Sequence, residues 1–389
     1  MGETTRTSMP RPDYRLRLPG PTAVPERVRQ AMARPVVNHR GPEFRAQMAE
    51  AEALLRPIIG TGNPILFLGC SGTGAMEASL ANLLAPGDRV LCLAHGQFGE
   101  RFAAIATALG ASVDTLAFPW GEGIDIAAVA DRLGQGEYRA VTATHNESST
   151  GAVADLAALG ALLRDRPEVL VVDSVSGLAG IEMRQDDWGV DVLVSASQKA
   201  LMCPPGLGLV SLSAKARALV ARETATPRFY FDFRRALDAA GKAETPFTAP
   251  TALIAALAEA LGMIHAEGID AVLARHRRLS DALRAGGAAL GLPDFTRAPV
   301  TSSTVVVMNV PGGIEGGAIV RGMYERHGSV IAGARNRLAG KVIRIGTMGH
   351  LTAGDILTDL QHLGLVLRAL GHNAAPEAGV AAAAAFLAH

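Results

Sequence analysis

The sequence predicts an α/β fold, with a mainly parallel sheet in a large domain and a smaller α+β domain after it. Short runs of apolar and small residues, typical of strands buried on both faces, alternate with stretches of helical periodicity. Gly and Pro mark the ends of many of these runs. The chain has 389 residues, which is too long for one compact core. Such alternation is typical of βαβ units, whose helices cover the sheet.

Five runs in the first half of the chain are predicted strands of the large domain. They are RVLCLA (89–94), SVDTLAF (112–118), AVTATH (140–145), VLVVDSV (169–175) and VDVLVSAS (190–197). Helical patterns such as GERFAAIATALG (99–110) and ALGALLRD (158–165) lie between them.

The pattern changes near Pro246–Pro250. Helices are predicted over 251–267 and 275–290, strands over 303–310, 330–335 and 341–348, and a last helix in the alanine-rich residues 374–389. We therefore expect a loose N-terminal arm over 1–18, a large domain over 19–255 and a small domain over 256–389.

Composition excludes several classes of protein. Acidic and basic residues balance at 37 each, which argues against a nucleic-acid partner. Cys70, Cys92 and Cys203 form no CxxC pair, so neither a disulfide framework nor a zinc site is expected. Reduced thiols fit a cytoplasmic enzyme best. There is no run of 18 apolar residues and no tight histidine cluster, so we predict neither a membrane span nor a metal site.

The motif SGTGAMEASL (71–80) follows the strand-like run ILFLGC. Free N–H groups at a helix start favour a phosphate, and Thr73 could add a hydroxyl donor. The alternative is a plain turn from strand to helix in which glycine supplies a positive φ. The motif lacks the GKT or GKS of an ATPase loop, which argues against that class.

Two further motifs allow both a binding role and a structural one. In HGQFGERF, Phe98 lies between two glycines, so a flat ring could stack on it, or it could be ordinary core. HNESSTG (145–151) ends a predicted strand, where open α/β sheets bind ligands. Glu147, Ser148 and Thr150 could equally be turn and cap residues, and the two interpretations do not exclude each other.

Three charged residues stand in mostly apolar surroundings. Asp173 ends the run VLVVD, and a buried carboxylate needs either Arg, backbone amides or a protonated ring nitrogen beside it. Lys199, in SASQKALMCPPGLG, is either a surface lysine or an amine whose pKa is lowered by burial for attack on carbonyls. Arg344, inside IRIG, calls for an anion, which is either a bound carboxylate or a structural salt bridge.

Taken in order, these motifs resemble the class V aminotransferases of fold type I, in the alanine–glyoxylate and serine–glyoxylate (serine–pyruvate) branch. The resemblance covers nearly the whole chain, and its most specific parts are SGTGAMEA, HNESSTG, VDSVSGLAG, SQKALMCPPG and RIGTMG. It implies a seven-stranded-type sheet and pyridoxal 5'-phosphate as the cofactor.

The resemblance also implies a role for each matching residue. Lys199 resembles the lysine that forms the Schiff base with the cofactor, and Asp173 the partner of the ring nitrogen. Phe98 stands where many relatives have a stacking Trp. The cofactor set is completed by Thr73, Gly74, Ala75, Gln198, Ser148 and Thr248, and the substrate set is Arg344 and Gly20. Ala75 replaces a polar residue of some relatives. Thr248 would reach the neighbouring subunit's phosphate, which implies a homodimer with shared sites.

The implied activity is a ping-pong transfer of an amino group from a small amino acid, such as alanine or serine, to a small 2-oxo acid, such as glyoxylate or pyruvate. A related class V enzyme acting on an aminophosphonate, aspartate or pyridoxamine is the closest alternative. A desulfurase is disfavoured because Gln198 precedes the lysine in place of histidine and no cysteine follows Cys203. A dehydrogenase would need GxGxxG, and a binding module has no reason to carry these three charged residues.

Overall fold

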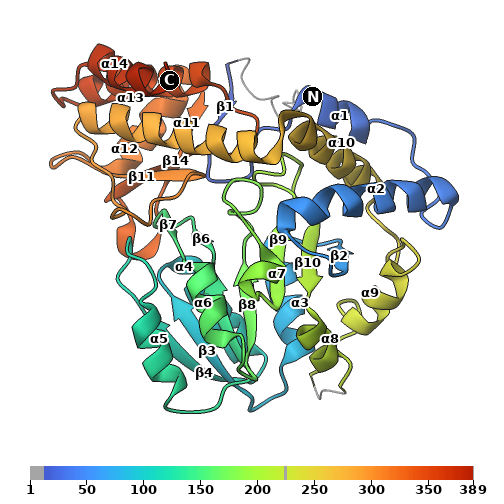
Figure 1. Cartoon of the computed structure of the whole chain (residues 1–389). Coiled ribbons are helices and arrows are strands. Elements are labelled where there is room, and N and C mark those ends of the chain that lie inside the picture. The colour runs from blue at the N-terminus through green and yellow to red at the C-terminus, as the bar shows by residue number, and fades with distance from the viewer. Residues whose placement is uncertain (1–12, 223–225, 389) are drawn as a thin grey trace, which may run out of the picture.

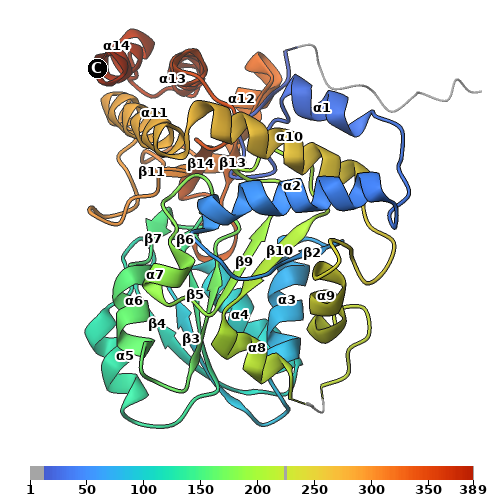
Figure 2. The same cartoon turned by 45° about the vertical axis from the view of Figure 1, so that its right-hand side comes forward.

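The computed structural model describes residues 13–222 and 226–388. Its centre is a seven-stranded sheet, which Figures 1 and 2 show with helices packed around it. In spatial order the strands are β2 (Ile65–Leu68), β10 (Gly208–Leu212), β9 (Val192–Ala196), β8 (Val169–Asp173), β5 (Ala140–Thr144), β3 (Arg89–Ala94) and β4 (Ser112–Ala117). β10 runs antiparallel to both neighbours, and the pairs from β9 to β4 are all parallel. The predicted mainly parallel sheet is confirmed.

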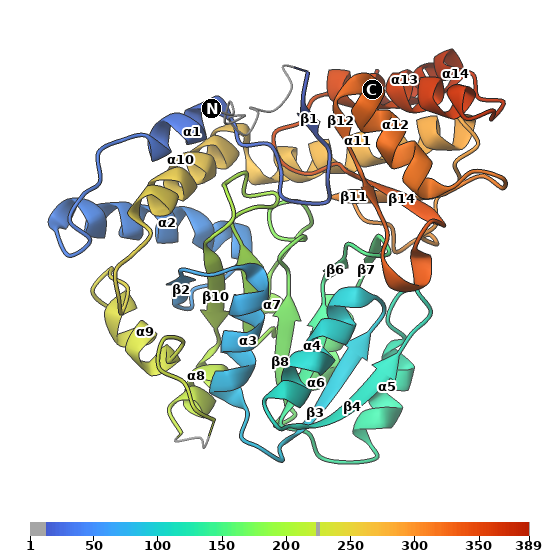
Figure 3. The same ribbon diagram turned by 180° about the vertical axis from the view of Figure 1, so that it is seen from behind.

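Alternate residues of each strand face two different cores, as the period of two requires. In β8, Leu170 and Val172 belong to one buried cluster, and Val169 and Val171 belong to the other. The first cluster includes residues of α2 (Pro42–Ile59), α5 (Ile126–Leu133), α6 (Leu156–Leu163) and α10 (Thr251–Glu267). The second includes residues of α3 (Gly72–Leu83), α4 (Gln97–Ala108), α8 (Ala214–Val220) and α9 (Phe233–Ala240). Figure 1 shows α6 in front of the sheet, and Figure 3, from behind, shows α3 and α4 in front.

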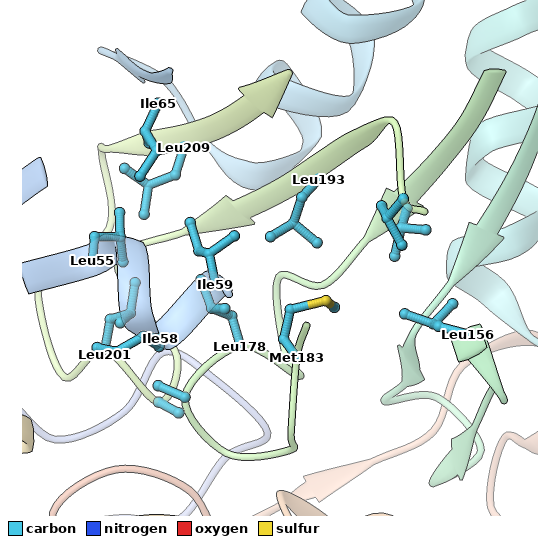
Figure 4. Packing of buried hydrophobic residues seen from close by; sticks show 14 of the residues in the cluster. Leu55, Ile58, Ile59, Ile65, Leu156, Leu178, Met183, Leu193, Leu201 and Leu209 are labelled. Atoms are coloured by element: carbon cyan, nitrogen blue, oxygen red, sulfur yellow. The ribbon is translucent and has the colours of Figure 1, made fainter. Parts of the chain in front are cut away.

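Apolar side chains of α2 pack against the sheet. Leu55 and Ile59 of α2 are buried in the same cluster as Leu193 of β9 and Leu209 of β10, as Figure 4 shows. Burying a side chain of this size stabilises the fold by roughly 1.5–3 kcal/mol. These contacts fix β9 and β10, and with them the loop that carries Lys199.

A smaller antiparallel sheet and four helices form the C-terminal body. The sheet order is β11 (Val305–Asn309), β14 (Val342–Gly346) and β13 (Ala332–Gly333). One buried cluster joins it to α11 (Ile269–Ala289), α12 (Gly316–His327), α13 (Ala353–Ala369) and α14 (Pro376–Leu387), which lies in the alanine-rich tail. The proposed division at 255/256 falls inside α10, so the domain limits stay a prediction.

Helix α11 begins earlier than the sequence pattern suggested, at Ile269 rather than at Arg275. Gly268, at φ 92°, separates it from α10, and Asp270 in its first turn favours a helix start by opposing the helix dipole. Among residues 13–222 and 226–388, no single helix has the length and apolar composition to cross a membrane. Helices α10 and α11 meet this length and composition only when they are taken together, and the angle between them is 85°.

The chain enters the fold through the C-terminal body. Residues 1–12 of the predicted arm lie outside the described residues. Strand β1 (Arg15–Leu16) pairs in parallel with β12 (Ser329–Val330), and buried Arg17 forms an ion pair with Asp359 of α13. The segment after Arg17 then crosses to the main sheet before α1 (Glu26–Met32) begins.

Candidate active site

A cavity of about 200 Å³ opens between the carboxyl ends of β8 and β9 and the first turns of α3 and α4. Five of the predicted site residues line it: Thr73, Phe98, Asp173, Gln198 and Lys199. Carboxyl ends of parallel strands and helix N-termini meet at this edge of an α/β sheet, so polar groups gather there without interrupting the core.

Asp173 reaches the cavity because of its register. It is the last residue of β8 and lies on the same face as Val169 and Val171, toward α3 and α4. Its side chain is buried and accepts a hydrogen bond from the backbone N–H of Val175 over 2.8 Å. Burial raises the pKa of this carboxyl to about 6, and the nearby charge of Glu147 adds to the rise. A backbone amide is thus one of the partners expected from the sequence.

Lys199 follows β9 in a tightly bonded turn. The Lys199 carbonyl accepts a hydrogen bond from the Met202 N–H, and the Ser197 hydroxyl donates to the Pro204 carbonyl over 2.6 Å. The ammonium donates to the carbonyl of Pro19. Burial lowers the pKa of Lys199 to about 8; Asp173 opposes this shift, and the cations of Arg344 and Arg101 add to it. Lys199 is half-buried and its ammonium is hydrogen-bonded within the protein, so the alternative of a fully solvated surface lysine is wrong.

The segment from Pro19 to Thr22 covers Lys199. The Thr22 N–H donates to the Gln198 carbonyl, and the Thr22 hydroxyl donates to the Lys199 carbonyl over 2.9 Å. Gly20 has a φ of 104°, and a Cβ there would lie 2.4 Å from Lys199 Nζ. Gly20, predicted in the substrate pocket, thus lies directly against the lysine.

The opposite wall consists of α3 and α4. Ser71 caps α3, because its hydroxyl oxygen accepts a hydrogen bond from the Gly74 N–H over 3.2 Å. Ala75, which follows Gly74, is fully buried. Gly72 and Gly74 are helical, so close packing rather than a positive φ requires glycine. A Cβ would lie 2.8 Å from Val175 at Gly72 and 2.9 Å from Cys70 at Gly74. Neither Gly74 nor Ala75 lines the cavity.

Arg101 is a cavity residue that the sequence reasoning missed. Its guanidinium lies 4.4 Å from the centre of the Phe98 ring, and its Nη1 donates to Thr73 Oγ1 over 2.9 Å. Phe98 is in the first turn of α4, so Arg101, three residues later, lies on the same helix face. That spacing in FGER was the available signal.

Arg344 joins the C-terminal body to the HNESSTG loop. From β14, its Nε and Nη2 donate to the Gly333 carbonyl over 3.0 and 2.8 Å, and its Nη1 donates to the carbonyl of buried Ser148 over 3.0 Å. Within the described part of the chain no salt bridge to Arg344 is found, so carbonyl oxygens replace the carboxylate expected as the structural alternative. Burial lowers its pKa, and Glu147 opposes this.

Thr248 is not brought to Lys199 within one chain. It is exposed and lies in a separate hollow with Gly69, Tyr230 and Phe247. The rings of Tyr230 and Phe247 stack with centres 5.2 Å apart, and Phe229 and Tyr230 are 65% and 47% exposed. In the two described ranges, no group of three His, Cys, Asp or Glu side chains could hold a metal ion.

Comparison with known proteins gives one family match and relatives with different names. Residues 20–335 match the aminotransferase class-V family. The chain is 40% identical to the soluble hydrogenase small subunit of Synechococcus sp. (strain PCC 6716), covering 96% of this chain and 98% of that one. It is 36% identical to serine–glyoxylate aminotransferase of Arabidopsis thaliana, covering 97% and 96%. The crystal structure of ureidoglycine–glyoxylate aminotransferase of Bacillus subtilis superposes with a TM-score of 0.95 at 29% identity, covering 99% and 100%.

Proposed function

Because the chain belongs to the aminotransferase class-V family, we propose that it transfers an amino group from a small amino acid to a small 2-oxo acid, with pyridoxal 5'-phosphate as cofactor. The observation that carries the proposal is the meeting of Lys199 and Asp173 in one cavity, at the ends of adjacent strands. The relatives named for serine–glyoxylate and ureidoglycine–glyoxylate transfer support glyoxylate as the acceptor. Their donors differ, so alanine and serine remain the first donors to test.

The residues of the cavity fit this cofactor. Phe98 offers a flat ring on one wall, while Thr73 and Arg101 offer an O–H and a cation for a phosphate. The side-chain oxygen of Gln198 is buried and accepts no hydrogen bond from the described residues, as expected of a group that bonds to a ligand. When bound, pyridoxal phosphate supplies an aldehyde that condenses with amines and a ring that accepts the electrons released at the amino acid's Cα.

Lys199 and Asp173 then perform the proton chemistry. With a pKa of about 8, Lys199 is partly unprotonated near neutral pH, so it can act as a nucleophile toward a carbonyl. When its amine carries no covalent bond to another group, Lys199 Nζ can accept the proton released at the amino acid's Cα, as a general base. It can then donate this proton as a general acid. Asp173, whose raised pKa of about 6 reflects its burial, would hold a proton at the ring nitrogen.

Arg344 is proposed to bind the substrate carboxylate. Three of its five N–H groups are used by the Gly333 and Ser148 carbonyls, which leaves two for a carboxylate fork. The carbonyls also fix the guanidinium plane, so the substrate's Cα would be held in one orientation toward Lys199. In a ping-pong exchange the two substrates occupy the site in turn, so one arginine can bind the carboxylate of each.

A homodimer and a cytoplasmic location complete the proposal. Exposed Phe229 and Tyr230 beside Thr248 form an aromatic surface suited to a second copy of the chain. Thr248 would then face the partner's cofactor phosphate. The three cysteines are free thiols, which agrees with a reducing compartment.

The test is an absorbance spectrum followed by a substrate panel. Purified protein should show the near-visible band of bound cofactor, and alanine, serine and aspartate should be tried against glyoxylate and pyruvate with the oxo-acid product measured. Lys199→Ala should lose both band and turnover, while Lys242→Ala, at an exposed lysine, should keep both. An unchanged spectrum in Lys199→Ala would refute the proposed role of this lysine.

A further inference from the structure

Glu147 is a fully buried carboxylate that the proposed chemistry does not use. It ends β6 (Asn146–Glu147), which pairs with β7 (Ala152–Val153) in a short hairpin. Figures 1, 2 and 3 all show this hairpin between the large sheet and the C-terminal body. A buried charge is costly unless its surroundings satisfy it, so its contacts are informative.

Both carboxylate oxygens of Glu147 are fully engaged. Oε2 accepts from the backbone N–H groups of Phe98 and Gly99 over 2.8 and 3.1 Å. Oε1 accepts from the N–H and hydroxyl of Ser149 over 3.2 and 2.6 Å. The Ser149 oxygen in turn accepts from the Gln97 N–H over 3.0 Å. Three free N–H groups at the start of α4 are therefore bonded to the hairpin, and all four donors to Glu147 are neutral.

Gly96 makes room for this contact. A Cβ at Gly96 would lie 2.2 Å from Glu147 Cγ and 2.4 Å from its Cδ. Its φ of 170° is open to any residue, so close approach alone requires glycine here. The first turn of α4 thus sits directly on the Glu147 side chain.

The same hairpin also supports the substrate side of the cavity. Ser148, next to Glu147, accepts the hydrogen bond from Arg344 Nη1 through its carbonyl. The charge of Glu147 favours the protonated Arg344, raising its pKa against the effect of burial. One side chain therefore bonds to the backbone of the predicted stacking residue and lies next to the peptide that orients the predicted carboxylate-binding arginine.

We propose that Glu147 is a positioning residue that fixes the position of Phe98 relative to Arg344. The cofactor ring on Phe98 and the substrate carboxylate on Arg344 are then held at a constant position relative to each other. The inference rests on the proposed function of the cavity. A carboxylate suits the role because it only accepts, whereas a glutamine amide would place N–H groups against the donors of Ser149 or α4. Asp173 and Lys199 supply chemistry; Glu147 sets where the bound molecules lie relative to them.

The test is Glu147→Gln in the holoenzyme, measured by two readouts besides turnover. The dissociation constant for pyridoxal phosphate should rise about tenfold, as expected from lost buried hydrogen bonds, and the visible circular dichroism per bound cofactor should fall. The KM for the amino acid should rise as well. Phe98→Leu should weaken mainly the binding of the cofactor, and Arg344→Lys should weaken mainly the binding of the amino acid substrate.

Double-mutant cycles then show whether Glu147 acts through these two residues. With Phe98→Leu present, Glu147→Gln should lose most of its effect on cofactor affinity, and with Arg344→Lys most of its effect on KM. Effects that simply multiply in both backgrounds would mean that Glu147 acts elsewhere, and the proposal would be overturned.

A matched control is Glu168→Gln. Glu168 is also a buried glutamate, but it pairs with Arg166 at the far end of β8. It should alter thermal stability without changing dichroism or KM. If Glu147→Gln does not fold, Ser149→Ala removes two bonds of the same network and should move both constants about threefold in the same direction. Wild-type protein that binds no cofactor would refute the proposed function. Normal cofactor binding and turnover in Glu147→Gln and Ser149→Ala, with the expected losses in Phe98→Leu and Arg344→Lys, would refute only the role of Glu147.

Discussion

Arg101 donates a hydrogen bond to Thr73 Oγ1 over 2.9 Å, and this contact joins the second turn of α4 to the first turn of α3. The two residues are 28 positions apart, yet both line the cavity. They place a fixed cation and a hydroxyl at a helix N-terminus, an arrangement that favours an anion.

Removing that cation should weaken the phosphate form of the cofactor selectively. Arg101→Met should raise the dissociation constant for pyridoxal phosphate about 10- to 100-fold, because hydrogen bonds to charged groups contribute roughly 1.5–3 kcal/mol. Binding of pyridoxal, which lacks the phosphate, should change little. Absorbance titrations of the apoprotein with both compounds measure this; equal losses for the two would place Arg101 away from the phosphate.

Gly20→Ala should displace Lys199. The added Cβ would lie 2.4 Å from Nζ and Cδ of the lysine, at a φ that disfavours any side chain. We expect the variant to bind cofactor at least tenfold more weakly and to lose most turnover. The control is Gly87→Ala, at a φ of 87° with open space around it, which carries the backbone strain without the collision. If both variants behave alike, the contact with Lys199 is unimportant.

Asp173→Asn should stabilise the apoprotein while abolishing most turnover. Burial raises the pKa of Asp173 from 3.8 to about 6, so folding favours the protonated form and stability is lost as pH rises through that interval. At pH 8 the neutral amide should gain about 1–3 kcal/mol in the free energy of unfolding. At pH 5 the gain should shrink, because the wild-type carboxyl is then largely protonated. Thermal unfolding at both pH values tests this; an equal gain at both would be inconsistent with it.

Mixed dimers should reveal whether Thr248 serves the neighbouring subunit. Thr248→Glu would place an anion where a phosphate is expected, and Lys199→Ala removes the amine. Refolding the two inactive variants together should restore roughly a quarter of the sites, since half of the dimers are mixed and one of their two sites is intact. Asp173→Ala mixed with Lys199→Ala is the control without recovery, because both residues line one cavity of one chain. No recovery in the first mixture would refute the sharing.

The main sheet and the positions of Asp173 and Lys199 could be predicted from sequence because the signals were local. Continuous apolar runs predicted β8 and β9. A carboxylate or lysine at the end of such a run is expected at the edge of the sheet, because the interior of the sheet is apolar. The break after Glu267 was predicted, but the start of α11 was placed at Arg275 and residues 269–274 were not assigned to the helix.

The remaining parts of the site depend on contacts between distant segments. Arg344 was expected to pair with a carboxylate, but it donates to the backbone carbonyls of Gly333 and Ser148 instead. Such backbone acceptors cannot be identified from a pattern of side chains in the sequence. The Pro19 carbonyl above Lys199 was hidden for the same reason. Glu147 stood out in HNESSTG, but whether it bound a ligand or capped a turn required the position of α4, whose N–H groups it accepts.

The strand before Pro19 pairs with the C-terminal body, and the residues after it close over the lysine. Residues 15–22 therefore connect the C-terminal body to the wall of the proposed active site. For protein engineering, we expect a bulky insertion close to Asp13, or a deletion that reaches Thr22, to disturb the contacts around Lys199.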